Sequence, residues 1–216
     1  MAFTDAVAPD GGVLSLTVHP RGWQWDLIEA ELGVPVYQVS QVHGANVVVV
    51  HSGSSPDEVA EIPADALVSP DAGLGLAVRV ADCVPVLLSD GAAGVIAAAH
   101  AGRAGLLVGV LERTVETMRS FGAKRIMARI GPHVCGECYE VPADMRADFC
   151  SVIPLGWATT SWGTPAIDLG RSAESVLNGM GVQVERRDPC TRTTPTLHSY
   201  RRDQQAAGRM AGIVWR

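Results

Sequence analysis

Two histidines and one cysteine stand where strand-like segments of the chain end or turn. His43 lies in a turn between two predicted strands, Cys83 interrupts two strand-like segments, and His100 ends a third before a glycine-rich turn. Turns at strand ends are where a scaffold displays reactive groups. One thiolate and two imidazoles suit zinc, and three protein ligands leave a fourth position open for water or substrate. The three residues lie far apart in sequence, with a spacing that matches no zinc finger or zinc ribbon. This favours a catalytic zinc site over a structural one.

The same three residues allow two other interpretations. Cys83 taken alone is a small buried apolar residue, and each histidine taken alone caps a turn. Alternatively, Cys83 is a thiolate nucleophile with His43 or His100 as its base. In the zinc interpretation, Asp82 directly precedes a ligand and could orient that ligand or a water. Spacing by itself does not decide between these roles.

Arginines are the candidates for anion binding, because the 17 basic residues include a single lysine. Arg201 and Arg202, followed by Arg209, form a basic cluster that could receive a phosphate through forked guanidinium contacts. Arg103 is a further candidate, because it lies close in sequence to a predicted zinc ligand. The alternative is a solvated turn whose charges pair locally.

Cys135 and Cys138 form a Cys-x-x-Cys motif, a pattern found in redox and metal sites. No second motif of this kind and no matching histidine pair accompanies it, so we expect a structural role. The chain has five cysteines, and its N-terminus has neither the basic start nor the apolar segment of a secretory signal. We therefore expect a reducing, cytoplasmic compartment.

The composition predicts one globular domain over residues 1–216. Apolar residues make up 47% and charged residues 19%, which excludes a disordered chain or a coiled coil. A net charge of −6 argues against a nucleic-acid partner, which would need a broad basic face. The segment Gly94–Leu111 contains a histidine, an arginine and several glycines, so we exclude a membrane span. The number of subunits stays open.

The elements that must position these residues follow from the apolar pattern. Short β-branched segments predict strands at Val13–Val18, Val34–Val39, Val47–His51, Leu74–Val80, Val84–Leu88, Gly94–Ala99, Arg125–Ile130, Val182–Arg186 and Met210–Trp215. Helical spacing predicts helices at Leu106–Ser120, Pro142–Cys150 and Gly170–Met180, with Gly122 and Gly181 closing the first and the third. Strands dominate early and helices come later, which favours an α+β fold over a regular βαβ alternation.

Several segments occur in the order and spacing of one known family. They are Gln41-Val42-His43-Gly44, Ala64-Asp65-Ala66-Leu67-Val68, Ala81-Asp82-Cys83-Val84-Pro85-Val86-Leu87, His100-Ala101-Gly102, Ile130-Gly131-Pro132, Cys138-Tyr139-Glu140-Val141, Cys190-Thr191, Ser199-Tyr200-Arg201-Arg202-Asp203 and Gly208-Arg209-Met210-Ala211. The chain thus resembles the laccase-domain family, once labelled multicopper polyphenol oxidase and now purine nucleoside phosphorylase or peptidoglycan editing factor. The match runs from about residue 43 to the C-terminus.

The resemblance implies a single-domain layered α/β/β/α sandwich with zinc held by His43, Cys83 and His100. It implies phosphorolysis of adenosine, inosine and methylthioadenosine, with purine nucleosides and phosphate as the bound molecules, and deamination of adenosine. On this basis Cys83 and Asp82 are the expected catalytic residues. The expected substrate contacts are Gln41, Arg103, Arg201 and Arg202.

Two other functions stay open at this point: a Cys-His hydrolase that edits peptidoglycan precursors, and a catalytically idle partner protein that binds zinc. The older copper label can be tested on ligand supply. Six histidines without a His-x-His pair cannot furnish a multicopper centre, although a single copper in place of zinc is allowed.

Overall fold

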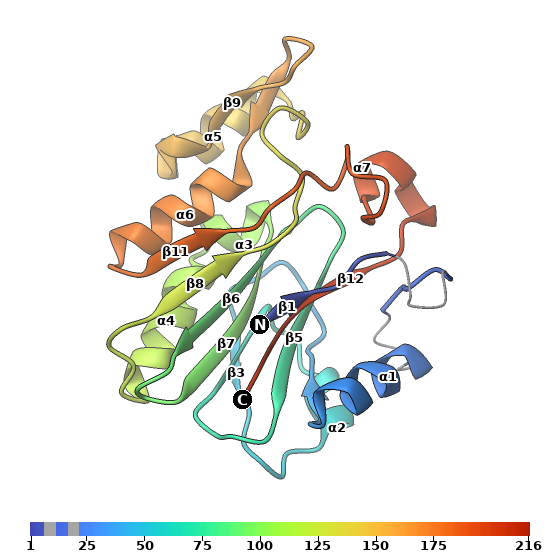
Figure 1. Cartoon of the computed structure of the whole chain (residues 1–216). Helices are drawn as coiled ribbons and strands as arrows, with labels where there is room; N and C mark the ends of the chain where they lie inside the picture. The colour runs from blue at the N-terminus through green and yellow to red at the C-terminus, as the bar shows by residue number, and fades with distance from the viewer. Residues whose placement is uncertain (7–11, 17–21) are drawn as a thin grey trace.

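Two β-sheets packed face to face occupy the centre of the molecule (Figure 1), a computed structural model that describes residues 1–6, 12–16 and 22–216. The larger sheet has the order β11-β8-β6-β7-β4-β3. Its strands are Gln183–Arg186, Met127–Ile130, Val84–Asp90, Val95–Ala101, Ala66–Ser69 and Val47–Val49. The smaller sheet has the order β1-β12-β5-β2. Its strands are Ala2–Phe3, Met210–Trp215, Gly75–Val80 and Val36–Tyr37.

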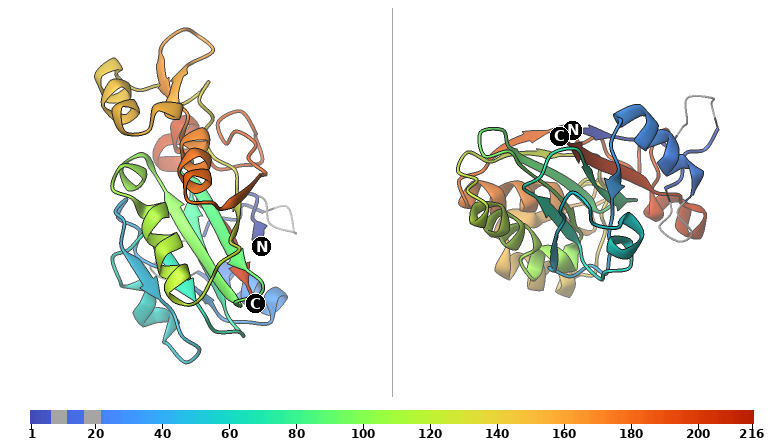
Figure 2. Two further views of the ribbon diagram at one scale, coloured as in Figure 1. Left: turned by 90° about the vertical axis from the view of Figure 1, so that its left-hand side faces the viewer. Right: turned by 90° about the horizontal axis from the view of Figure 1, so that it is seen from below.

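Helices cover the outer faces of both sheets, and a small hairpin stands apart from them (Figure 2). The helices are α1 (Trp23–Leu32), α2 (Pro56–Ala60), α3 (Arg103–Leu107), α4 (Val110–Ser120), α5 (Ala143–Val152), α6 (Leu169–Gly179) and α7 (Tyr200–Asp203). The hairpin pairs β9 (Trp157–Thr159) with β10 (Pro165–Ile167). Two short 3-10 turns, Pro154–Gly156 and Gln204–Ala206, complete the described elements.

Three apolar clusters define the layers. The largest lies between the six-stranded sheet and α4, α5 and α6. The second lies between the two sheets, where Leu87 of β6 meets Val78 of β5 and Val214 of β12. The third packs Trp25 of α1 against the far side of the smaller sheet at Ile213. The order helix, sheet, sheet, helix confirms the predicted α+β fold with its layered α/β/β/α arrangement.

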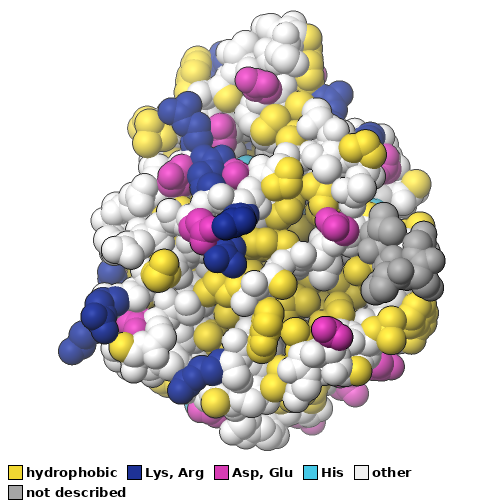
Figure 3. Space-filling model, viewed as in Figure 1, with side chains coloured by type: hydrophobic (Ala, Val, Ile, Leu, Met, Phe, Trp, Pro, Cys, Tyr) yellow, Lys and Arg dark blue, Asp and Glu magenta, His cyan; other side chains and the backbone are white. Residues whose placement is uncertain are grey.

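The central strands are buried on both faces, and this explains their sequences. Every residue of β7 is buried, as are six of the seven residues of β6. A strand covered on both sides carries a continuous apolar run in place of alternation. The edge of the sheet formed by β8 and β11 is different, and Figure 3 shows basic and acidic side chains mixed over it. There Arg129 pairs with Glu185 at 2.8 Å.

Most predicted elements are confirmed within a few residues, but several details were wrong or missing. The segment predicted as one helix over Leu106–Ser120 is two helices, because Gly109 adopts a left-handed conformation with φ of 83° between α3 and α4. Residues 13–16 form no strand, and the rest of the predicted strand Val13–Val18 lies outside the described residues. The sequence also gave no indication of the strand β4, of the helices α1, α2 and α7, or of the hairpin β9–β10. Gly122 and Gly181 do follow their helices with positive φ, as predicted.

No helix in the described part of the chain is long and apolar enough to cross a membrane.

Candidate functional site

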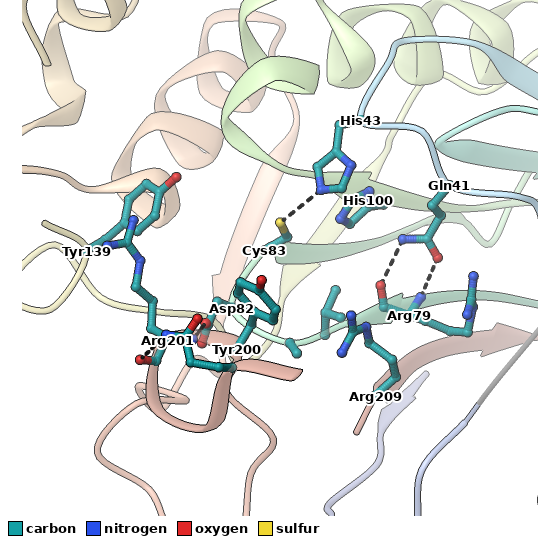
Figure 4. Close-up of a pocket in the computed structure, with 13 residues that line it drawn as sticks. Gln41, His43, Arg79, Asp82, Cys83, His100, Tyr139, Tyr200, Arg201 and Arg209 are labelled. Atoms are coloured by element: carbon teal, nitrogen blue, oxygen red, sulfur yellow. Dashed lines mark hydrogen bonds between the residues drawn. The ribbon is translucent and has the colours of Figure 1, made fainter. Parts of the chain in front are cut away.

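His43, Cys83 and His100 come together from three different parts of the fold (Figure 4). Their ligand atoms all lie within 4.8 Å of one another. The Sγ of Cys83 is 3.8 Å from Nε2 of His43, and the two imidazole rings meet edge to face with centroids 4.8 Å apart. The structure thus brings the three predicted zinc ligands into one cluster.

Strand pairing places two of the three. In the antiparallel pair β6–β7, Pro85 lies opposite His100. Cys83 directly precedes β6, so it lies at the same edge of the sheet as His100. The third, His43, lies in the loop between β2 and β3 and adopts a positive φ of 61°. A positive φ is uncommon in residues other than glycine and must be stabilised by the surroundings.

The carboxylate of Asp65 stabilises that loop and orients His100. It accepts hydrogen bonds from three successive backbone N–H groups, those of Val42 at 3.2 Å, His43 at 2.9 Å and Gly44 at 2.6 Å. It also lies 2.8 Å from Nδ1 of His100. Burial raises the pKa of Asp65, but the hydrogen bonds outweigh burial and hold it below its ordinary value. Asp65 is therefore an ionised carboxylate with no exposed surface.

An ionised carboxylate can only accept a hydrogen bond, so Nδ1 of His100 carries the proton and Nε2 keeps its lone pair. Burial lowers the pKa of His100, which favours this neutral form. A histidine that donates one ring N–H to a carboxylate and offers the other nitrogen is the usual arrangement of a metal ligand. The donor set and the orientation of His100 therefore fit a zinc ion.

Gly102 leaves no spare room beside the cluster. A Cβ at this position would lie 2.9 Å from Cδ2 of His43 and 3.2 Å from Sγ of Cys83. Both values are closer than ordinary van der Waals contact. Glycine at position 102 therefore lets the backbone before α3 approach the three side chains.

The thiol of Cys83 is held protonated when no cation is near. Burial, followed by the charges of Asp82 and Asp65, raises the pKa of Cys83 to about 12. A thiol must lose its proton to act as nucleophile or metal ligand. A bound divalent cation removes that proton outright.

The cluster opens into a cavity of about 650 Å³ that collects polar side chains from both sheets and from α7 (Figure 4). Its lining comprises Gln41, His43, Arg79, Val80, Ala81, Asp82, Cys83, His100, Tyr139, Tyr200, Arg201, Gln204 and Arg209. This volume is within the range of small-molecule binding sites.

Three arginines make the cavity positive. Arg79 has a buried Nε without a hydrogen-bond partner among the described residues. Burial, followed by the charge of Arg209, lowers the pKa of Arg79 to about 10. The guanidinium of Arg201 lies 4.7 Å from the centre of the Tyr139 ring. The guanidinium groups of Arg79 and Arg209 repel each other, and Arg79 has an unused donor. Such a pair favours an anion between the two groups.

Only some of the other predicted site residues line the cavity. Gln41 lines the cavity, but its amide is engaged by the backbone of Arg79, with both hydrogen bonds at 2.8 Å. Asp82 also lines it, and its two carboxylate oxygens accept from the hydroxyl of Thr191 and the N–H of Arg201, both at 2.6 Å. Arg201 itself reaches the cavity.

Arg202 and Arg103 are not brought into the lining. The guanidinium of Arg202 donates to the carbonyl groups of Thr191 and Leu197 and to the carboxylate of Asp203. It holds the loop before α7 instead of facing the cavity. Arg103 is the first residue of α3.

Sequence reasoning missed several residues of this site. Asp65 was named only within a segment shared with the family, because its four contacts become visible when distant loops meet. Arg79 had an available signal, since it is the one charge inside the apolar segment Leu74–Val80. Tyr200 was named only as part of a segment shared with the family, and Gln204 carried no signal.

These observations define a class: a layered α+β protein with a cysteine–histidine cluster, suited to a metal, inside an arginine-lined cavity. The chain belongs to the family described as multi-copper polyphenol oxidoreductase laccase, whose model matches residues 24–216. Proteins named purine nucleoside phosphorylase are similar to it in sequence. One from Streptomyces coelicolor is 47% identical over 196 residues, with 88% of this chain and 80% of the relative covered. One from Streptomyces griseus is 50% identical over 184 residues, with 83% and 74% covered.

Solved structures share the fold. A Neisseria meningitidis protein of 30% identity matches with a TM-score of 0.80, covering 99% of this chain and 89% of that one. YlmD from Geobacillus stearothermophilus, 27% identical, matches with a TM-score of 0.80 and covers 99% and 87%. In the described part of the present chain, the residues that could hold a metal form two groups: the cysteine–histidine cluster and three cysteines, Cys135, Cys138 and Cys190.

Proposed function

We propose that this protein is a metal-dependent purine nucleoside phosphorylase with zinc as its metal, acting on adenosine, inosine and methylthioadenosine and also deaminating adenosine. The observation that carries the proposal is a single cavity that joins the cysteine–histidine cluster to Arg79, Arg201 and Arg209. The names of the relatives support the phosphorylase part of this proposal.

The metal would be held by His43, Cys83 and His100. When bound there, zinc supplies a Lewis acid with an open coordination position, which is the chemistry that zinc deaminases use. Asp65 keeps the proton of His100 on Nδ1 and so keeps Nε2 available. Copper in place of zinc is allowed by the same ligands.

The arginines would bind the phosphate. In phosphorolysis a phosphate oxygen forms a bond to C1′ of the ribose while the bond from C1′ to the purine nitrogen breaks, so the phosphate must be oriented toward the sugar. Arg79 offers its free Nε, and Arg209 faces it from the neighbouring strand end. Forked contacts from guanidinium groups give a phosphate both affinity and a fixed orientation.

Tyr139 and Tyr200 would hold the purine. Both line the cavity, and aromatic rings bind nucleobases by stacking. Arg201 lies against the Tyr139 ring and fixes its position. A cavity of about 650 Å³ has room for a nucleoside together with phosphate.

Purified protein incubated with adenosine, with and without phosphate, tests the proposal when the products are separated by chromatography. Adenine that forms only with phosphate establishes phosphorolysis, and inosine formed without phosphate establishes deamination. Removal of the metal with a chelator should abolish both, and added zinc should restore them.

Two outcomes would contradict the proposal. Turnover that survives the chelator and is lost on alkylation of Cys83 would make the protein a Cys-His hydrolase, the function suggested for peptidoglycan precursors. No product with zinc at full occupancy, and no shift of the melting temperature with any nucleoside, would make it a zinc-binding partner protein.

A further inference from the structure

A second cluster of sulfur atoms lies outside the cavity. Cys135 and Cys138 lie in the loop after β8, and Cys190 lies between β11 and α7. Their three Sγ atoms lie within 4.8 Å of one another, and none is in a disulfide. The motif Cys-x-x-Cys alone gave no third partner, which is why the sequence favoured a merely structural pair.

The backbone holds these three residues in place without any metal. The N–H groups of Cys138 and Tyr139 both donate to the carbonyl of Cys135, at 2.9 and 3.0 Å, and form a tight turn. The N–H of Cys135 donates to Sγ of Cys190 at 3.4 Å. An isolated bridge between His133 and Cys190 joins the two segments. The cluster is therefore built by both loops and is not an accident of side-chain placement.

The turn has no room for a side chain at Gly136, which directly follows Cys135. A Cβ at Gly136 would lie 2.8 Å from Cβ of Asp168 and 3.1 Å from Cβ of Ala158. The turn is thus pressed against the start of α6 and the hairpin strand β9. This contact fixes the two cysteines of the motif relative to the rest of the fold.

A basic side chain stands beside the sulfur atoms. Arg192 follows Cys190 by two residues, and its guanidinium donates to the carbonyl of Cys138 at 3.3 Å. The same guanidinium lies 4.7 Å from the centre of the Trp162 ring. Three thiolates around a divalent cation leave one net negative charge, and an adjacent arginine compensates it.

We propose that Cys135, Cys138 and Cys190 form a second metal site that binds a zinc ion through three thiolates. Thiolates select soft d¹⁰ cations such as zinc over magnesium or calcium. No fourth histidine, cysteine or carboxylate joins this group among the described residues, so water takes the remaining position. Cys138 is buried, and Cys135 and Cys190 are partly exposed, which gives an ion access from one side.

This zinc would fasten the segment that ends in α7. Thr191, next to Cys190, donates to Asp82 at 2.6 Å, and the carbonyl of Thr191 accepts from Arg202. Asp82 in turn accepts from the N–H of Arg201, whose side chain lines the cavity. A metal at the three cysteines would therefore stabilise the loop that carries part of the cavity wall.

Zinc counts on matched variants test the proposal. Under reducing conditions, elemental analysis should find two zinc ions per wild-type chain, one in H43A/H100A, one in C135S/C190S and two in C150S. Cys150 is the control, because it is a buried thiol outside both clusters. Counts of one zinc in the wild type and one in C135S/C190S would overturn the proposal.

A second measurement does not depend on the folding of the cysteine variant. H43A/H100A keeps all five cysteines, so cobalt(II) added to it should produce a sulfur-to-metal absorption band in the near ultraviolet. Zinc should then remove the band and protect three thiols from alkylation, as counted by mass spectrometry. A protein that shows no band and no protected thiols, or that forms a disulfide within the cluster while excluding metal, would refute the site. Both readouts are independent of the phosphorylase activity.

Discussion

Asp65 is the residue whose substitution tests the proposed zinc site most directly. Its carboxylate has no exposed surface and takes part in four contacts. One oxygen faces His100 Nδ1 at 2.8 Å and the N–H of His43 at 2.9 Å. The other accepts from the N–H groups of Val42 and Gly44. Asp65→Asn keeps the size of the side chain and replaces one acceptor oxygen by an NH₂ group.

Either orientation of the new amide disturbs two of these contacts. If the amide oxygen faces His100, the NH₂ group opposes the N–H groups of Val42 and Gly44. If the amide is reversed, the NH₂ group opposes His43 and donates to Nδ1 of His100. That donation moves the imidazole proton to Nε2, the nitrogen that would bind zinc. Loss of two hydrogen bonds to a charged acceptor, with buried donors left unpaired, costs about 3 kcal/mol of unfolding free energy.

Two measurements on Asp65→Asn follow. Denaturant unfolding should give the loss of about 3 kcal/mol, and competition with a chelator should give zinc affinity reduced about 10- to 100-fold. Asp71→Asn is the matched control. Its carboxylate also accepts from a backbone N–H, that of Ser52 at 2.8 Å, and contacts a histidine Nδ1, that of His51 at 3.2 Å, but on the surface. Wild-type zinc affinity and stability in Asp65→Asn would refute the reasoning.

Three further predictions concern separate parts of the molecule. Gly102→Ala should lower zinc affinity, measured by chelator competition, because its Cβ would lie 2.9 Å from the His43 ring; unchanged affinity would show that the cluster can shift. Arg79→Gln should raise KM for phosphate about 10- to 100-fold, the value of one charge-assisted hydrogen bond, and leave KM for the nucleoside unchanged in steady-state assays. Four backbone N–H groups, those of Arg125 and Lys124 foremost, hold the pKa of Asp90 far below its usual range. Its contribution to stability is therefore complete above about pH 4 and is lost as the pH falls further; melting temperatures of the wild type and Asp90→Asn should converge in that range, and a constant difference would contradict this.

The fold could be predicted where burial on both faces left a continuous apolar segment. β6, β7 and β12 were found for this reason, and α6 was found from its apolar spacing and from the glycine that closes it. The helix α1 could not be found in the same way, because Trp25 is its only fully buried side chain and its apolar spacing is weak. The break at Gly109 was missed because a glycine inside a periodic segment is also compatible with one continuous helix.

The candidate site could likewise be predicted only in part. The three residues of the cysteine–histidine cluster could be singled out because reactive side chains at strand ends are unusual taken one by one. The residue that orients these side chains could not be found, because Asp65 accepts a hydrogen bond from His43, which lies 22 residues away in sequence. The third cysteine of the second cluster was missed for the same reason. Such contacts depend on how loops pack and leave no local pattern.

Asp82 shows how the two clusters are connected. It adopts a positive φ of 92°, in the left-handed region that residues other than glycine avoid. Its carboxylate accepts two hydrogen bonds of 2.6 Å, from Thr191 and from the N–H of Arg201. Both oxygens are thus engaged by the segment that begins at Cys190, while the backbone of Asp82 leads directly into Cys83. Asp82 must keep this conformation to present Cys83 to the two histidines, and the segment that begins at Cys190 stabilises it. A substitution at either cluster should therefore alter the geometry of the other.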